Sequence, residues 1–227
     1  MAQQSIWEKE YQKPKLVTGG DEPLKDVRNF LKFLRKKGIE RNNLKILDLG
    51  SGSGKNSNYL AELGNEVVGL EISKTAIKIA KDNATVKDVE VQYINQNIGE
   101  KYPFSDNYFD LAIDVTSSNS LNEEERDAYL VETKRVVKPE GYFFVRALCL
   151  DGDKNAKNLL KMFPGKEKDT YLIKDMGLIE RVFSEKDFKE LYSKYFKIIE
   201  LNKKSSYAKF GSQSYKRNYW LAYLQKI

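Results

Sequence analysis

The stretch KILDLGSGSG, residues 45–54, decides the fold of this chain. Its first half, Lys45 to Leu49, is a short apolar run typical of a buried strand. Gly50 to Gly54 form a glycine-rich turn, and a helical pattern follows over residues 56–63. A strand that leads through glycines into a helix is typical of a doubly wound α/β sheet, where ligands bind at the carboxyl ends of the strands. The turn therefore predicts a ligand site as well as a fold.

The spacing of the glycines separates the cofactor classes that use such turns. The dinucleotide fingerprint G-x-G-x-x-G requires glycine at position 55, where this chain has Lys55. The phosphate loop requires glycine at position 49 and Ser or Thr at position 56, where the chain has Leu49 and Asn56. Both classes are excluded, and an acidic residue, Asp48, two positions before G-x-G-x-G remains.

Strands and helices alternate around the turn as far as residue 150. The patterns predict strands over 45–49, 66–71, 89–94, 109–114 and 141–150, and helices over 24–34, 56–63, 74–84 and 122–137. Beyond that point we expect a polar, irregular stretch over 151–183, a helix over 184–195, and strands over 196–201 and 215–224 joined by the link 202–214. Alternation of this kind implies a parallel sheet covered on both faces.

We therefore predict one α/β domain, residues 1–227, built on a doubly wound, Rossmann-like, seven-stranded sheet. The sheet is expected to be mostly parallel, with an antiparallel last strand and helices on both faces. Within it we expect an N-terminal cap (1–40), a cofactor-binding core (41–150), a substrate-lid insertion (151–183), and a C-terminal helix with an antiparallel strand pair (184–227).

Composition excludes several kinds of chemistry. The 227 residues include one cysteine and no histidine, which excludes an internal disulfide framework, Ser-His-Asp and Cys-His catalysis, and the usual zinc sites. We expect no metal site. The N-terminus carries Glu8, Lys9 and Glu10 where a signal peptide needs an apolar run, so we expect a cytoplasmic protein that does not enter a membrane.

The net charge of +6 lies entirely at the C-terminal end. From Lys203 onward the chain carries six basic residues and no acidic one, interleaved with aromatic residues. A nucleic-acid surface is one interpretation. The interpretation we favour is a hairpin with solvated lysines and core aromatic side chains.

Asp48 to Gly54 resembles motif I of the class I S-adenosylmethionine-dependent methyltransferases. Four further segments fall in the order that this family has, so the resemblance covers about residues 44–150. They are residues 67–73 with their acidic Glu71, residues 95–104, residues 105–111, and residues 135–142. The branch most similar is the small-molecule type, like the quinone-biosynthesis and tellurite-resistance methyltransferases.

The resemblance implies S-adenosylmethionine as cofactor, S-adenosylhomocysteine as product, and a role for each matching residue. Gly50, Gly52 and Gly54, with Ser51 between them, would let the turn approach the cofactor. Asp48 would lie near the cofactor's ammonium group, and Glu71 would accept both ribose hydroxyls. Ile72 would cover the adenine, Asn97 would accept from its amino group, and Ile98 would offer a backbone N–H. Asp114 would lie near the methionine end.

Simpler interpretations remain open for two of these residues. Asn97 stands where the family often has Asp, and it also suits a turn. Asp114 also suits a cap for the loop over residues 115–121.

The methyl acceptor is predicted to be a small molecule, and the methylated atom stays open between N, S, O and C. Candidates for catalysis are Asp114, Asn119 and Tyr11, and candidates for acceptor binding are Trp7, Tyr11, Arg146, Tyr171 and Arg181. The alternatives are an RNA or protein methyltransferase that uses the basic C-terminal region, and a cofactor-binding protein without catalysis. No pattern predicts the oligomeric state.

Overall fold

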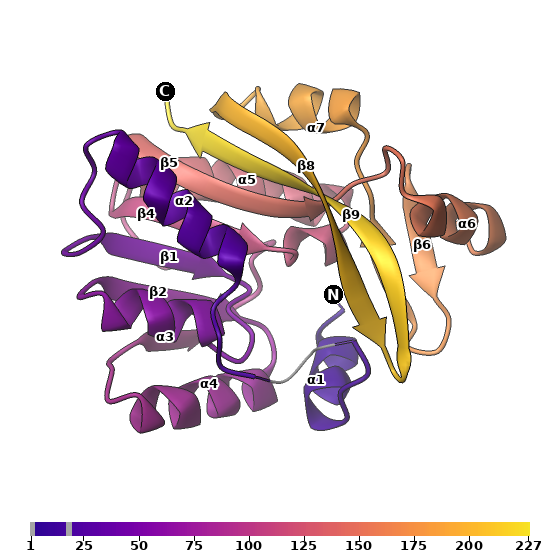
Figure 1. Cartoon of the computed structure of the whole chain (residues 1–227), viewed down its shortest axis with the longest axis horizontal. Helices are drawn as coiled ribbons and strands as arrows, with labels where there is room; N and C mark the ends of the chain where they lie inside the picture. Colours follow the sequence, from indigo (N-terminus) through magenta and orange to yellow (C-terminus); the bar gives the residue numbers. More distant parts are fainter. Residues whose placement is uncertain (1–2, 17–19) are drawn as a thin grey trace.

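The computed structural model describes residues 3–16 and 20–227, and it contains the predicted α/β sheet (Figure 1). Seven strands lie in the order β3-β2-β1-β4-β5-β9-β8. Their bounds are β1 Lys45–Leu49, β2 Glu66–Glu71, β3 Gln92–Asn95, β4 Phe109–Val115, β5 Val137–Leu148, β8 Lys197–Phe210 and β9 Gln213–Gln225. The five strands β3, β2, β1, β4 and β5 pair in parallel with their neighbours in this order. β9 is antiparallel to both of its neighbours, β5 and β8, as predicted.

Helices cover both faces of the sheet. On one face lie α2 (Lys25–Lys36) and α3 (Lys55–Glu62), whose apolar side chains join a cluster that includes Phe30, Leu60 and Phe144. On the other face lie α5 (Glu123–Val136) and α7 (Glu185–Tyr192), which contribute Tyr129 and Phe188 to the larger cluster. α2 crosses in front of the strands in Figure 1, and α5 lies behind them. The sheet is therefore buried between two layers, as its apolar strands require.

Helix starts follow the caps that the sequence contains. The Asn122 side chain accepts from the Glu125 N–H, and the Glu125 carboxylate accepts from the Asn122 N–H, which completes a capping box at the start of α5. Ser73 accepts from the Ala76 N–H and begins α4 (Lys74–Val86) directly after β2. These caps place both helix N-termini at the carboxyl edge of the sheet, where the glycine turn lies.

Two strand boundaries predicted from the sequence are wrong by a few residues. The third strand begins at Gln92, three residues later than expected, because the first residues of its apolar run precede the pairing with β2. The fifth strand begins at Val137, directly after α5, whereas we expected it to begin at residue 141. The pairing of Phe109 with Val137 extends the strand through this segment, across a register shift.

The stretch 151–183 is not irregular, which corrects the expectation. It holds helix α6 (Lys154–Met162) and an antiparallel pair of strands, β6 (Thr170–Ile173) and β7 (Leu178–Arg181). A small cluster around Tyr171, Ala156 and Tyr219 packs this unit against β9. The predicted role of this segment as a substrate lid stays a prediction.

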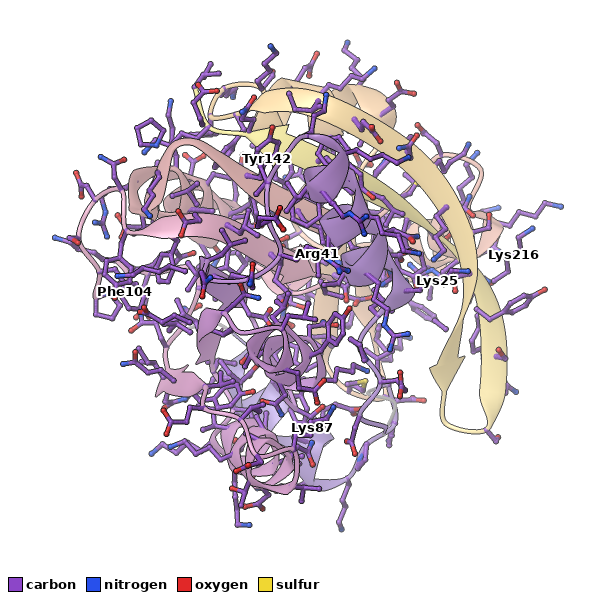
Figure 2. All side chains as sticks on the ribbon, turned by 60° about the vertical axis from the view of Figure 1, so that its left-hand side comes forward. Lys25, Arg41, Lys87, Phe104, Tyr142 and Lys216 are labelled. Atoms are coloured by element: carbon purple, nitrogen blue, oxygen red, sulfur yellow. The ribbon has the colours of Figure 1, made fainter. Side chains whose placement is uncertain are left out.

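The C-terminal hairpin is also longer than expected, because the link 202–214 is almost entirely strand. β8 and β9 pair from Lys197↔Gln225 to Phe210↔Gln213 and turn at residues 211–212. Tyr219, Trp220 and Tyr223 are buried, as the favoured interpretation has it, but Tyr207 is 73% exposed. The hairpin extends beyond the sheet, and Lys216 projects from it (Figure 2).

Two short elements complete the edge of the sheet where the strands end. Helix α1 (Gln4–Gln12) lies near the end of the long hairpin (Figure 1). The 3-10 helix η1 (Ser118–Ser120) follows β4 in the chain. Within the described ranges, no helix has the length and apolar character that a membrane span requires.

Candidate functional site

The glycine turn has the left-handed backbone that its three glycines allow. Gly50, Gly52 and Gly54 have φ of 71°, 55° and 80°. A Cβ on Gly52 would lie 2.5 Å from the Tyr11 hydroxyl oxygen, and one on Gly50 would collide with the Ser117 side chain. The fold therefore requires glycine here even without a ligand, and the approach of the turn to a cofactor stays a prediction.

Glu71 ties the turn to the end of β2. Its Oε2 accepts from the Gly52 N–H at 2.9 Å and its Oε1 accepts from the Ser73 N–H at 2.8 Å. Burial raises the pKa of the Glu71 carboxyl, and these backbone hydrogen bonds oppose the rise. The arrangement leaves a carboxylate with further lone pairs at the carboxyl edge of the sheet.

Asp48 is a second buried carboxyl group beside the turn. It is 1% exposed, and its Oδ2 accepts from the Ser57 hydroxyl at 2.6 Å. Burial raises the pKa of Asp48 to about 7, against the Ser57 hydrogen bond, and the charges of Asp114 and Glu71 add to the rise. The group therefore changes protonation near neutral pH, and a nearby cation would favour its ionised form.

Asp114, the third buried carboxyl group, organises the loop after β4. It accepts from the Ser117 N–H at 2.8 Å and from the Tyr129 hydroxyl at 2.7 Å, and it also accepts from the Ser118 N–H. Burial raises its pKa. These contacts are those of a loop cap, and they support the simpler of the two interpretations.

No lysine or arginine of the described chain lies within ion-pair distance of Asp48, Glu71 or Asp114. The buried Ser51 hydroxyl beside them also has no hydrogen-bond partner among the described residues. Buried carboxylates without a counter-ion are costly unless a ligand compensates them. The site therefore suits a ligand that carries positive charge and hydroxyl groups.

The predicted adenine contacts lie at the end of β3. The backbone N–H of Ile98, which is 7% exposed, has no acceptor within the described part of the chain, so it is free to donate to a ligand. Asn97 Oδ1 accepts from the Gly99 N–H at 2.9 Å, as a turn residue does. Ile72 is partly exposed beside them. The role of Asn97 toward the adenine stays a prediction.

Helix α1 packs against the glycine turn through Tyr11. Glu8 accepts from the hydroxyls of Ser73 at 2.7 Å and Thr75 at 2.5 Å, which fixes α1 to the start of α4. Tyr11 then lies over Gly52, and burial together with the nearby charges of Glu71, Glu10 and Asp48 raises its pKa well above the usual value. The Tyr11 hydroxyl is therefore protonated at neutral pH, so it suits a hydrogen-bond donor rather than a base. Trp7 is half-buried on the same helix.

The other predicted residues do not converge on one place. Arg146 pairs with Asp26 at 3.4 Å and lies over the Tyr219 ring at 3.4 Å from its centre. Tyr171 donates to Glu180 at 2.7 Å and accepts from Arg217 at 2.8 Å, contacts that hold the small sheet in place.

Asn119 and Arg181 lie nearer the loop after β4. Asn119 bridges this loop to β5, donating to the Thr116 carbonyl and accepting from the Leu148 N–H. Arg181, at the end of β7, has a buried Nε without a partner.

Several residues of the site were not predicted. Ser57 donates to Asp48, Ser117 donates to the Gly50 carbonyl, and Glu8 accepts from the start of α4. In the sequence, only the hydrogen-bonding hydroxyl or carboxyl group of each residue could have indicated a role. Arg126 was also missed, since it reads as an ordinary charge on α5.

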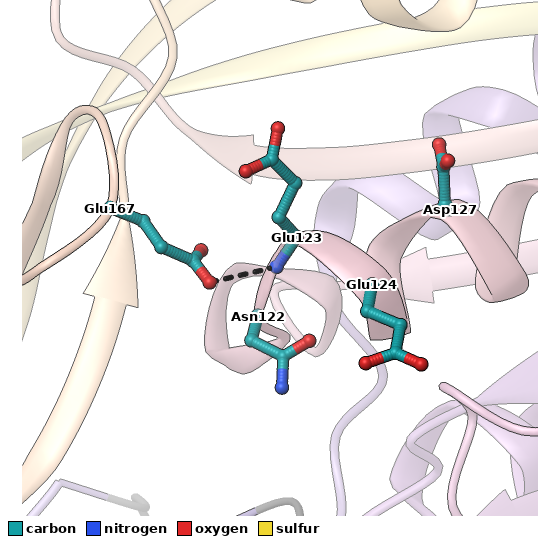
Figure 3. Close-up of a pocket in the computed structure, with 5 residues that line it drawn as sticks. All are labelled: Asn122, Glu123, Glu124, Asp127 and Glu167. Carbon is teal, nitrogen blue, oxygen red and sulfur yellow. Dashed lines mark hydrogen bonds between the residues drawn. The ribbon is translucent and has the colours of Figure 1, made fainter.

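A shallow pocket of about 580 Å³ lies at the N-terminus of α5 (Figure 3). Four carboxylates and an amide line it, from Asn122, Glu123, Glu124, Asp127 and Glu167. Glu167 accepts from the Glu123 N–H at 3.1 Å. Acidic side chains at a helix N-terminus are favoured by the helix dipole, which accounts for this group without a ligand.

Sequence comparison matches residues 47–145 to the family described as a methyltransferase domain. The ubiquinone biosynthesis O-methyltransferase of Bartonella quintana is 31% identical over 106 residues, which are 47% of this chain and 42% of that protein. The match thus spans less than half the length of that relative. An uncharacterized methyltransferase of Schizosaccharomyces pombe is 28% identical over 45% of this chain and 70% of its own.

Solved structures share the fold. A SAM-dependent methyltransferase from Methanosarcina mazei is 24% identical with a TM-score of 0.75, and covers 91% of this chain and 99% of its own. TehB from Haemophilus influenzae is 18% identical with a TM-score of 0.67, over 97% of this chain and 67% of that one.

The resemblance predicted from residues 44–150 is confirmed by these matches, and S-adenosylmethionine is the cofactor that the family uses. Residues 47–145 of this chain thus match the methyltransferase domain family, and the similar solved structures share its fold.

Proposed function

We propose that this chain transfers a methyl group from S-adenosylmethionine to a small-molecule acceptor. The observation that carries the proposal is the group of three buried carboxyls, Asp48, Glu71 and Asp114, with no cationic side chain of the described chain in ion-pair contact. S-adenosylmethionine brings a sulfonium and an ammonium, together with two ribose hydroxyls. The donor and acceptor groups of the site fit such a molecule.

Each part of the cofactor has a matching group on the chain. Glu71 is proposed to accept from the ribose hydroxyls, and Asp48 to balance the ammonium. The Ile98 N–H is proposed to donate to the adenine, with Ile72 against its face. Tyr11, fixed over the turn by the contacts of Glu8, is placed to keep water out of the site.

When bound, S-adenosylmethionine supplies an electrophilic methyl carbon whose leaving group is a neutral thioether. The work of the chain is then to align the acceptor and exclude water. The hydroxyl of Tyr11 is held protonated, and Asp114 already accepts from Tyr129 and the loop after β4. Neither is placed as a base. We infer that the acceptor releases its proton to solvent, which suits a thiol or an amine.

A small acceptor is favoured because hydrogen bonds of Gln3 tie together three segments near the region where we expect the acceptor to bind. Gln3 Nε2 donates to the Ser120 carbonyl at 2.7 Å and to the Ile179 carbonyl at 2.8 Å, while the Ile179 N–H donates to Gln3 Oε1 at 2.6 Å. These bonds join the N-terminal segment, the loop after β4 and β7. One structural neighbour, a 1,6-didemethyltoxoflavin-N1-methyltransferase of Burkholderia thailandensis, has a small molecule and S-adenosylhomocysteine bound; it is 17% identical (TM-score 0.63, over 88% of this chain and 78% of that one).

The second candidate function is methylation of RNA. The observation behind it is the basic hairpin β8–β9, on which Lys216 and the 73%-exposed Tyr207 face solvent. RNA binding that weakens steeply with salt would favour it. The cytoplasmic location expected from the sequence stays a prediction with either function.

The proposal is tested by measuring S-adenosylhomocysteine released from the purified chain with panels of thiols, amines, phenols and carboxylic acids. We expect turnover with at least one small acceptor, and none when the acceptor is left out. Tight cofactor binding without turnover on any acceptor, RNA included, would instead indicate a cofactor-binding protein without catalysis.

The raised pKa of Asp48 makes cofactor affinity depend on pH. Since the group titrates at about 7 in the free protein, a cationic ligand must displace its proton below that pH. We expect the affinity for S-adenosylmethionine to fall by up to about tenfold for each pH unit below 7, and to level off above 8. Calorimetric titration between pH 5.5 and 8.5 measures this, with Asp48→Asn as the variant that should lose the dependence.

The same pKa shift sets the sign of a stability effect. The folded chain binds the Asp48 proton up to about pH 7, whereas the unfolded chain releases it near its ordinary value of 3.8, so stability falls as pH rises between these values. The unliganded Asp48→Asn chain should therefore melt at a higher temperature than the native chain at pH 8. A lower melting temperature at pH 8 would contradict the assignment.

A further inference from the structure

Two arginines of the described chain combine buried polar atoms with the lack of a carboxylate at ion-pair distance. Of the eight arginines, Arg28, Arg135, Arg146 and Arg217 each lie within 4 Å of a carboxylate. Arg35 is exposed and Arg41 is partly exposed, where water solvates the charge. Arg126 and Arg181 remain, and neither has an ion pair within the described chain although both have buried polar atoms.

Arg126 is enclosed by the protein and only partly satisfied. The residue is 1% exposed, and its Nη2 donates to the Leu121 carbonyl, but Nε and Nη1 have no partner among the described residues. Burial and the neighbouring charge of Arg181 lower its pKa to about 10. A guanidinium held in this way is costly for the free protein, and a bound anion would compensate it.

Arg181 reaches the same place from β7. Its guanidinium carbon lies over the Phe183 ring at 4.8 Å from the ring centre, and that of Arg126 lies over the same ring at 5.8 Å. The Nε of Arg181 is buried without a partner. Two side chains from different elements thus bring unpaired donors to one aromatic ring.

This place adjoins the proposed site of methyl transfer. Arg126 lies one helical turn before Tyr129 on α5, so both lie on one face, and Tyr129 donates to Asp114 at 2.7 Å. Leu121, which Arg126 contacts, ends the loop that begins at Ser117, and the Ser117 hydroxyl donates to the Gly50 carbonyl at 3.2 Å. The Ser120 hydroxyl in the same loop is buried without a partner.

The acidic pocket nearby does not supply the missing counter-ion. Glu123 and Glu167 are the carboxylates of that pocket whose charge reaches Arg126, but neither lies within 4 Å of it in the described structure. Glu167 accepts from the start of α5 instead (Figure 3).

We propose that Arg126 and Arg181 bind a carboxylate of the methyl acceptor, so that the substrate class is a small carboxylic acid. The proposal rests on the proposed function for the identity of that ligand. Guanidinium groups bind carboxylates through paired N–H···O contacts, and the Phe183 ring favours an unsaturated or aromatic acid beside them.

The test uses sodium benzoate as the probe, with benzamide as its uncharged counterpart and inorganic phosphate as a second anion. Binding to the full chain is measured by calorimetry in the presence of S-adenosylhomocysteine, for the native protein, Arg126→Met and Arg181→Met, with Arg35→Met as the surface control. We expect benzoate to bind the native and Arg35→Met chains at least tenfold more tightly than either other variant, and benzamide to bind none of them. The unliganded Arg126→Met chain should melt no lower than the native chain.

Equal benzoate affinity in native and Arg181→Met chains would overturn the proposal, as would tighter binding of phosphate than of benzoate. So would an absence of benzoate binding to the native chain. Binding of S-adenosylhomocysteine is measured separately, and an absence of that binding would count against the proposed function. The benzoate affinities of the native and variant chains, measured without S-adenosylhomocysteine, would still decide whether the two arginines form an anion site.

Discussion

Replacement of Glu71 by alanine is expected to weaken binding of S-adenosylmethionine and of S-adenosylhomocysteine by about 100-fold or more. Hydrogen bonds to a charged group contribute about 1.5–3 kcal/mol each, and two ribose hydroxyls are proposed to share this carboxylate. Since about 1.4 kcal/mol is a factor of ten in affinity, the loss of both bonds predicts this effect. Calorimetric titration of the purified chain measures it directly.

The matched control is Glu66→Ala, on the same strand. Glu66 lies at the opposite end of β2, where it pairs with Lys45 at 3.8 Å and accepts from Tyr108 at the surface. Its removal should leave both affinities within about twofold, since an exposed ion pair contributes little. Glu71→Ala also removes the acceptor for the Gly52 and Ser73 N–H groups, so circular dichroism of both variants should accompany the titration. Unchanged affinity in a folded Glu71→Ala chain would contradict the cofactor site.

Replacement of Phe144 by alanine is expected to lower the free energy of unfolding by about 3–5 kcal/mol. Phe144 is fully buried on β5, with ring centres 5.3 Å from Phe30 on α2 and 5.8 Å from Tyr223 on β9. The substitution leaves a cavity where three elements meet, and it removes aromatic contacts as well as buried area. Urea unfolding measures the loss as a lower midpoint with an unchanged slope.

Val131→Ala is the comparison for this second variant. Val131 lies on the outer face of α5 and is 50% exposed, so its shortening should change stability by no more than about 0.5 kcal/mol. Similar losses in the two variants would mean that the layer formed by α2 does not contribute to the core as the structure describes.

Local patterns predicted the alternation of strands and helices, and with it the mostly parallel sheet. β1, β2 and β4 are short apolar runs, and the helices α3, α4 and α5 begin after Gly54, Ser73 and Asn122 as N-caps. These signals are local because a cap or a left-handed glycine depends on a few neighbouring residues. Asp48 and Glu71 were therefore located from the sequence, at the ends of β1 and β2.

Patterns failed where pairing partners are far apart in the chain. The link 202–214 reads as a loop, since its alternating polar residues carry no apolar face, yet it is strand because β8 and β9 pair along their whole length. The segment 151–183 reads as irregular for a related reason. Its strands β6 and β7 are four residues each, and they are stabilised by packing around Tyr171 rather than by their own pattern.

The sequence by itself determined the fold class, the glycine turn and the acidic residues at its edge, because strand periodicity, turn chemistry and capping are local properties. Only the tertiary structure decided which charges have partners. Arg146, Tyr171 and Arg181 look alike as candidates in the sequence, but Asp26 pairs with the first and Glu180 and Arg217 hold the second. Arg181 instead meets Arg126 beside Phe183. Burial and the geometry of residues distant in the chain set these differences, and no single segment contains them.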